Sequence, residues 1–157
     1  MITLEPIGYV KNSRNEPTDD FWGGIISEII IDEKYPEDCL KGIEGFSHLE
    51  IIFYFDKADK NKIITGAKSP RGNPAWPETG IFVQRGKNRP NQIGATIVKL
   101  VKKEGRSVFV EGLDAINETP VLDIKPVIRE FMPSGAIDQP EWATELMKNY
   151  WKNRIKD

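Results

Sequence analysis

The chain has 157 residues, of which 39% are hydrophobic and 29% charged, with a net charge of -2, as is ordinary for one soluble globular domain. A single cysteine, Cys39, and a single histidine, His48, exclude an internal disulfide and a cysteine- or histidine-rich metal site, so no metal is expected. No apolar run approaches the roughly 20 residues that span a bilayer, and the N-terminus lacks the pattern of a signal peptide, so a cytoplasmic location is expected. The lone Cys39 is expected to be a small, buried hydrophobic residue.

The first third of the chain favours strands. Residues 2–11 alternate in polarity, residues 24–32 form an isoleucine-rich run typical of a buried strand, and residues 46–55 are strongly β-prone. Between them, residues 12–24 are polar and predict a loop. Residues 36–41 predict one helical turn, with a proline suited to the first helical position.

A long polar and basic loop is predicted over residues 56–77. Residues 81–84 predict a short strand. Residues 95–102 and 107–113, separated by a turn at Glu104-Gly105, predict a hairpin.

The last predicted strand covers residues 119–126. Its period of two places Val121, Asp123 and Lys125 on one face and the residues between them on the other. Residues 140–153 carry an apolar stripe that predicts a helix, with Asp138 or Gln139 as its cap. Six or seven strands and a terminal helix predict a mainly β fold, a single antiparallel barrel-like domain with short helical turns.

Two polar clusters remain after phosphate-binding glycine loops and hydrolase triads are excluded. The first holds Arg85, Lys87, Asn88, Arg89, Asn91 and Gly94, and the second holds Asp114, Asn117, Glu118, Thr119, Asp123 and Lys125. Guanidinium groups bind carboxylates or phosphates, and aspartates accept from ammonium or ribose hydroxyl groups, so together they suit a zwitterionic, ribose-bearing ligand. In the alternative interpretation these charges lie on solvated loops, and Asp123–Lys125 is a surface pair.

Trp76 and His48 also have two interpretations each. Trp76, in the Asn-Pro-Ala-Trp-Pro segment of the 57–79 loop, can stack on a base or an adenine ring, or attach its loop to the core or to a partner subunit. His48 follows Ser47 in a β-prone stretch, where a hydrogen-bonded strand residue is the alternative to a catalytic base.

Four segments together resemble one family. They are Ile-Gly-Tyr-Val at 7–10, Gly-Ile-Glu-Gly-Phe-Ser-His-Leu-Glu-Ile-Ile-Phe at 42–53, Arg-Gly-Lys-Asn-Arg-Pro-Asn-Gln-Ile-Gly at 85–94 and Gly-Leu-Asp-Ala-Ile-Asn-Glu-Thr-Pro-Val-Leu-Asp-Ile-Lys-Pro at 112–126. In these segments the chain resembles the TsaA-like (YaeB, TrmO) family of S-adenosylmethionine-dependent tRNA methyltransferases, as a divergent subgroup.

The resemblance implies a β-barrel-like domain over residues 1–135, a C-terminal helical extension over 136–157 packed on it or on a partner subunit, and a homodimer. It implies that S-adenosyl-L-methionine is bound without a nucleotide-binding glycine fingerprint. The cofactor-binding positions that carry over are Arg85, Arg89, Asn91, Gly94, Asp114, Thr119, Asp123 and Lys125, and main-chain groups around Ile93 and Gly94 are expected to line the adenine. Glu118 and His48 are the candidate proton acceptors.

The implied reaction is N6-methylation of threonylcarbamoyladenosine at tRNA position 37. Seven bases against one acid over residues 85–106 support a polyanionic partner, whereas ten acids against two bases over residues 16–50 do not. The chain has Gly-Lys-Asn at 86–88, where the tRNA-modifying members read Ser-Pro-His, and Asn117-Glu118 where they read Asp-Gly. These departures leave two alternatives open, methylation of a small metabolite or other nucleoside, and a non-catalytic S-adenosylmethionine-binding module.

Overall fold

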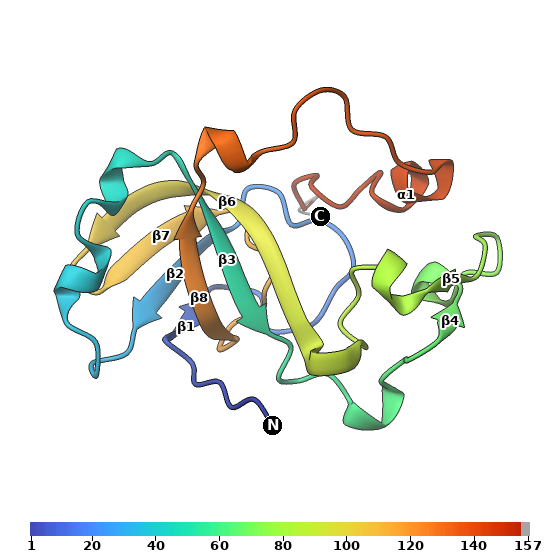
Figure 1. Ribbon diagram of the computed structural model, residues 1–157, viewed down its shortest axis with the longest axis horizontal. Coiled ribbons are helices and arrows are strands. Elements are labelled where there is room, and N and C mark those ends of the chain that lie inside the picture. The colour runs from blue at the N-terminus through green and yellow to red at the C-terminus, as the bar shows by residue number, and fades with distance from the viewer. Residues whose placement is uncertain (155–157) are drawn as a thin grey trace.

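The barrel predicted from the sequence is confirmed by the computed structural model, which describes residues 1–154 (Figure 1). Six antiparallel strands close in the order β1-β2-β7-β6-β3-β8. The strands are β1 (Gly8–Lys11), β2 (Ile26–Ile31), β3 (His48–Tyr54), β6 (Ile93–Glu104), β7 (Ser107–Glu111) and β8 (Pro120–Pro126). The predicted hairpin is β6–β7, and the pairing of Gly8 with Val121 closes the barrel.

Short elements surround this barrel. Strands β4 (Ala67–Lys68) and β5 (Thr79–Gly80) form a small separate sheet, and α1 (Glu141–Leu146) is near it at the right of Figure 1. The 3-10 turns are Glu37–Leu40, Ile43–Gly45, Lys60–Lys62, Pro70–Gly72, Ile81–Val83, Pro90–Gln92 and Arg129–Phe131. Within residues 1–154, none of the helices has the length and apolar content that crossing a bilayer requires.

Alternating side chains fill the barrel interior. In β3, Leu49, Ile51 and Phe53 are buried while the residues between them face outward, because successive side chains of a strand point to opposite sides. Ile29 of β2 and Val110 of β7 are also fully buried in this core. Burial of each such side chain contributes about 1.5–3 kcal/mol, so the alternation fixes the registers of the strands.

The antiparallel order gathers three long loops at one end of the barrel. Residues 12–25, 55–92 and 112–119 each leave a strand and enter the next at this end, which we call the Gly94 end. The opposite end, where β3 begins, is the His48 end. Six residue steps of β3 separate the two ends by about 20 Å.

The predicted alternation of β8 is wrong. Ile52 pairs with Asp123 and Phe53 pairs with Val121, so Leu122 is an extra residue, a β-bulge. Val121 and Ile124 therefore both pack into the core, although they are three residues apart. The bulge depends on the register with β3, which periodicity within one strand does not contain.

Three local predictions are also corrected. In place of a strand at 81–84, Ile81–Val83 form a 3-10 turn directly after β5, capped by the bond from the Gln84 amide to the Ile81 carbonyl. In residues 2–11 only the last four form a strand, and Ile2 and Leu4 are exposed. Cys39 is an exposed free thiol on the turn at Glu37–Leu40, preceded by Pro36 at the cap position.

The C-terminal helix is shorter than predicted, with only Glu141–Leu146 in α-helix. The amides of Phe21 and Trp22 bond the carbonyls of Asn149 and Tyr150, so the chain leaves the helical path to pair with residues 21–23. Pro140 occupies the cap position, and neither Asp138 nor Gln139 provides a side-chain cap. Residues 155–157 of the predicted extension lie outside the described residues.

Candidate functional site

Most of the predicted site residues belong to the loops of the Gly94 end. Arg85, Arg89 and Asn91 lie in the loop before β6, and Asp114, Glu118 and Thr119 lie in the loop between β7 and β8. Residues almost 30 positions apart in the sequence thus share one end of the barrel. The two polar clusters become neighbours because the barrel closes, not because of their spacing.

The arginine loop is held by its own polar side chains. The Gln84 side-chain amide donates to the carbonyls of Lys68 and Thr79, at 2.7 and 3.1 Å, and the Arg89 Nη1 donates to the carbonyl of Gln84 at 2.6 Å. Arg85 donates to the carbonyl of Ala95 in β6. A guanidinium group has five N–H donors, so both arginines keep donors for an anion.

A strained turn connects this loop to β6. Asn91 and Gln92 both have positive φ, at 64° and 51°, which is unusual for residues other than glycine. The buried Gln92 holds the turn, because its Nε2 donates to the Phe55 carbonyl at 2.9 Å and its own carbonyl accepts from the Phe55 amide at 2.8 Å. Such backbone strain concentrates at functional sites.

Gly94 and Ile93 begin β6 beyond that turn. A Cβ built on Gly94 would lie 2.5 Å from the Phe53 ring and 2.9 Å from the Phe55 ring. The glycine of the predicted motif is therefore required by core packing. Ile93 faces outward and is 36% exposed.

Asp114 is the centre of a hydroxyl-lined cluster. Its Oδ1 accepts from the Thr96 hydroxyl at 2.5 Å, and its Oδ2 accepts from the Tyr150 hydroxyl. Burial, followed by the charge of Asp114, raises the pKa of Tyr150 well above its usual range, while the charges of Arg71 and Arg85 oppose this rise. The phenol therefore stays protonated and donates at physiological pH.

Glu118 and Thr119 lie beside this loop's return to the barrel. The buried Thr119 hydroxyl donates to the Ile116 carbonyl at 2.7 Å, and its position there is structural. Glu118 has a positive φ of 71°. Its side chain is exposed, and its carboxylate Oε2 lies 3.5 Å from the Nζ of Lys57. It lines a hollow of about 510 Å³ with Tyr9, Lys11 and Asn117.

The structure places His48 and Lys125 away from those residues, whereas Asp123 lies level with Ile52 and Ala95 in the barrel. His48 lies at the opposite end of β3, with its Nδ1 2.7 Å from the Ser47 hydroxyl. Asp123 and Lys125 form an exposed ion pair at 2.7 Å, which is the predicted surface pair, and that contact raises the pKa of Lys125. Within one copy of the chain, Glu118 and His48 do not face the same acceptor.

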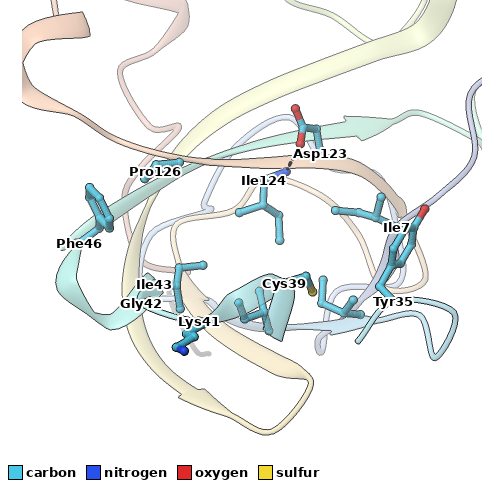
Figure 2. Close-up of a pocket in the computed structure, with 12 residues that line it drawn as sticks. Ile7, Tyr35, Cys39, Lys41, Gly42, Ile43, Phe46, Asp123, Ile124 and Pro126 are labelled. Carbon is cyan, nitrogen blue, oxygen red and sulfur yellow. Dashed lines mark hydrogen bonds between the residues drawn. The ribbon is translucent and has the colours of Figure 1, made fainter. Parts of the chain in front are cut away.

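An apolar pocket of about 350 Å³ lies at the His48 end (Figure 2). Its walls are residues 39–43 and Phe46 of the loop before β3, together with Ile7, Ile31, Tyr35, Asp123, Ile124 and Pro126. In Figure 2 the side chain of Ile124 points inward, whereas the carboxylate of Asp123 points away. The pocket therefore presents few groups to bind a charged ligand.

The 57–79 loop is attached to the C-terminal segment. The Trp76 indole donates to the Glu145 carboxylate at 2.8 Å, and Arg71 makes a two-pronged contact with Asp20, at 3.0 and 3.3 Å. Trp76 thus joins its loop to α1, which is neither the core nor a partner subunit. Nearby, the buried Arg14 lies 4.2 Å from the Trp22 ring and donates to the Phe21 carbonyl.

One loop of the Gly94 end, residues 57–89, carries an excess of basic side chains, whereas the loops at 12–25 and 112–119 supply acidic ones. Residues 57–89 contain eight lysines and arginines, against two acids, Asp59 and Glu78. In the described part of the chain, only Lys57 and Arg71 of these cations form ion pairs with a carboxylate. Such an excess attracts phosphate and other anions.

Sequence reasoning missed Tyr150 and Thr96. Tyr150 belongs to the apolar stripe of residues 140–153, which indicates packing against the core or a dimer partner. The signal that could have found it is general, since a buried tyrosine hydroxyl needs a hydrogen-bond partner. Thr96 gave no signal in the sequence, because alternation in β6 predicts burial at that position and not a polar partner.

Comparisons with known proteins agree with this architecture. Residues 11–132 match the family described as tRNA-methyltransferase O N-terminal domain. A human protein named tRNA (adenine(37)-N6)-methyltransferase is 46% identical over 114 residues, which are 73% of this chain and 25% of that protein. An S-adenosyl-L-methionine-binding protein of Archaeoglobus fulgidus is 34% identical over 128 residues, 79% of this chain and 88% of that protein.

A crystal structure of TrmO from P. aeruginosa has the same fold, with a TM-score of 0.73 at 23% sequence identity over 90% of this chain and 62% of that chain. The chain spans about a quarter of the human methyltransferase that it matches. The family match alone covers more than half of the chain and includes both polar clusters. The chain therefore belongs to the tRNA-methyltransferase O N-terminal domain family.

Proposed function

We propose that this protein binds S-adenosyl-L-methionine at the Gly94 end and methylates N6 of the modified adenosine at position 37 of tRNA. The 46% identity with the human protein named tRNA (adenine(37)-N6)-methyltransferase carries this proposal. We also propose that the chain divides into a barrel domain at residues 1–135 and an extension at residues 136–157. A tRNA substrate also implies a cytoplasmic location.

The residues present fit the cofactor. Arg85 and Arg89 keep guanidinium donors for a carboxylate, and Asp114 keeps acceptor sites for an ammonium or a ribose hydroxyl group. Their opposite charges at one end of the barrel match a zwitterion. The main chain of the turn at Asn91 and Ile93–Gly94 is the proposed lining for the adenine.

When bound, S-adenosyl-L-methionine supplies an electrophilic methyl group on a sulfonium, and the protein needs no covalent intermediate. The protein's own task is to hold donor and acceptor in line and to exclude competing water. Glu118 is the proposed proton acceptor, because it lies at the Gly94 end and lines a hollow there. His48 lies at the other end of β3, so its proposed role needs an acceptor bound there, while Asp123 and Lys125 follow this end along β8.

The acceptor can be identified by incubating the purified protein with methyl-labelled cofactor and tRNA from cells that lack the enzyme. We expect label in tRNA at position 37, and binding that weakens steeply as salt rises, because phosphate contacts release counterions. Label that enters only a small-molecule extract would instead establish the metabolite alternative. Heat on binding S-adenosylhomocysteine, without turnover on any extract, would establish a binding module, which the name of the archaeal relative favours.

We also propose a homodimer. Ile93, Ile97 and Val101 lie at every fourth position on the outer face of β6, each 36–47% exposed, and form an apolar row on one sheet surface. Glu50 and Lys99 on the same face supply opposite charges that a two-fold axis can pair. A second copy of the chain is the proposed occupant.

Replacing Ile97 with glutamate is expected to convert a dimer to a monomer, since two carboxylates would be buried near the two-fold axis. Light scattering after gel filtration measures the mass. Ile26→Glu, at a similarly exposed position on β2, is the control and should stay dimeric. A wild-type mass of one chain would contradict the proposal.

A further inference from the structure

The carboxylate of Asp114 is held at both oxygens by hydroxyl groups from distant parts of the chain. Thr96 comes from β6, two residues after Gly94, and donates to Oδ1. Tyr150 comes from the C-terminal segment and donates to Oδ2. That segment lies beyond residue 132, where the match to the family domain ends.

The C-terminal segment is held by backbone hydrogen bonds to residues 21–23 of the loop between β1 and β2. The amides of Phe21, Trp22 and Gly23 donate to the carbonyls of Asn149, Tyr150 and Lys152, at 3.2, 2.8 and 3.2 Å. Gly23 leaves room for the segment, because a Cβ there would lie 2.0 Å from the Trp151 carbonyl oxygen. The Tyr150 ring also contacts the Trp151 ring edge to face, with centroids 4.9 Å apart. Backbone contacts thus fix Tyr150 over Asp114.

Asp114 retains the capacity to bind a cation in this arrangement. An ionised carboxylate offers about four acceptor sites, and the two hydroxyls use two of them. Thr96 is buried and Tyr150 is largely buried, so both hydroxyls are fixed while the carboxylate is half-buried. The charges of Arg71 and Arg85 lower the pKa of Tyr150 against the larger rise, so positive charge acts on the hydroxyl that binds Asp114. A ligand with an ammonium next to a carboxylate matches both signs.

We propose that Tyr150 is a positioning residue that orients Asp114 to receive the ammonium of the methionyl part of the cofactor. The proposal rests on the proposed function. It extends the cofactor site to a segment outside the matched family domain. The phenol does not touch the reacting atoms, and it acts through the carboxylate.

The test compares two ligands by calorimetry, S-adenosylhomocysteine and 5′-methylthioadenosine, which lacks the amino-acid part. Tyr150→Phe removes one oxygen and keeps the ring contact with Trp151, so the fold should persist. We expect about tenfold weaker binding of S-adenosylhomocysteine, the cost of one hydrogen bond to a charged group, with unchanged binding of 5′-methylthioadenosine. Trp76→Phe removes a different side-chain hydrogen bond to this segment, the one to Glu145, and should bind both ligands as the wild type does.

Equal weakening for both ligands would show that Tyr150 supports the site only structurally, and would overturn the proposal. Wild-type affinity of Tyr150→Phe for S-adenosylhomocysteine would overturn it too. If the wild-type protein binds neither ligand, the proposed function itself fails. The three results are distinguishable in one series of titrations.

Discussion

Replacing Gly94 with alanine is expected to lower the free energy of unfolding by about 1–3 kcal/mol, the usual cost of an added methyl group in a filled core. The new Cβ would lie 2.5 Å from the buried Phe53 ring and 2.9 Å from the Phe55 ring, so both rings must shift. Denaturant titration followed by circular dichroism measures the change. A valine at the same position should destabilise the protein further.

Gly86 is the matched control, because a Cβ there meets nothing within 4 Å and its φ is not positive. Gly86→Ala should be neutral or stabilise the protein by up to about 1 kcal/mol through the unfolded chain. Equal stability of Gly94→Ala and the wild type would contradict the packing account. The comparison also separates two roles of Gly94, since a folded Gly94→Ala that has lost affinity for S-adenosylhomocysteine would show a direct part in the site.

The strand positions could be predicted because their signal is local. The isoleucine run of β2 and the alternation of β3 both reflect half-buried strands, and the turn at Gly105 identifies the β6–β7 hairpin. Closure of the barrel is not local, since Gly8 pairs with Val121 across most of the chain. The sequences of β1 and β8 do not indicate that these two strands pair with each other.

The errors have the same origin. The bulge at Leu122 depends on the register between β8 and β3, and the early end of the last helix depends on the amides of Phe21 and Trp22. In both cases contacts with a distant segment override the local propensity of the sequence. The 81–84 segment is strand-like in composition, but the chain turns after β5, and the side-chain amide of Gln84 donates to the carbonyls of Lys68 and Thr79.

The candidate site was partly predictable for the same reason. Residue types in the two clusters indicated a zwitterionic ligand, and the antiparallel topology brings Arg85, Arg89 and Asp114 to one end. Asp123 and His48 were grouped with them by sequence motifs, which carry no distances. Tyr150 was missed because its partner, Asp114, lies 36 residues away. A motif identifies the chemistry of a site, but the fold determines which of its members can meet.

Replacing Gly23 with alanine is expected to release the C-terminal segment while the barrel stays folded. The added Cβ would lie 2.0 Å from the carbonyl oxygen of Trp151, a backbone atom that cannot rotate away as a side chain can. The amides of residues 21–23 would lose their acceptors, and each such bond contributes about 0.5–1.5 kcal/mol. These amides should therefore exchange with solvent at least about tenfold faster.

Hydrogen exchange followed by mass spectrometry measures residues 21–23 and the C-terminal segment separately from the barrel strands. Gly45→Ala serves as the control, because a Cβ at Gly45 meets nothing within 4 Å. If Tyr150 orients Asp114, Gly23→Ala must also weaken binding of S-adenosylhomocysteine at least as much as Tyr150→Phe does, since it displaces the whole segment. Full protection of residues 21–23 in the variant would show that the segment accommodates the methyl group. Faster amide exchange at residues 21–23 with unchanged affinity for S-adenosylhomocysteine would instead show that the C-terminal segment contacts these residues but does not contribute to ligand binding.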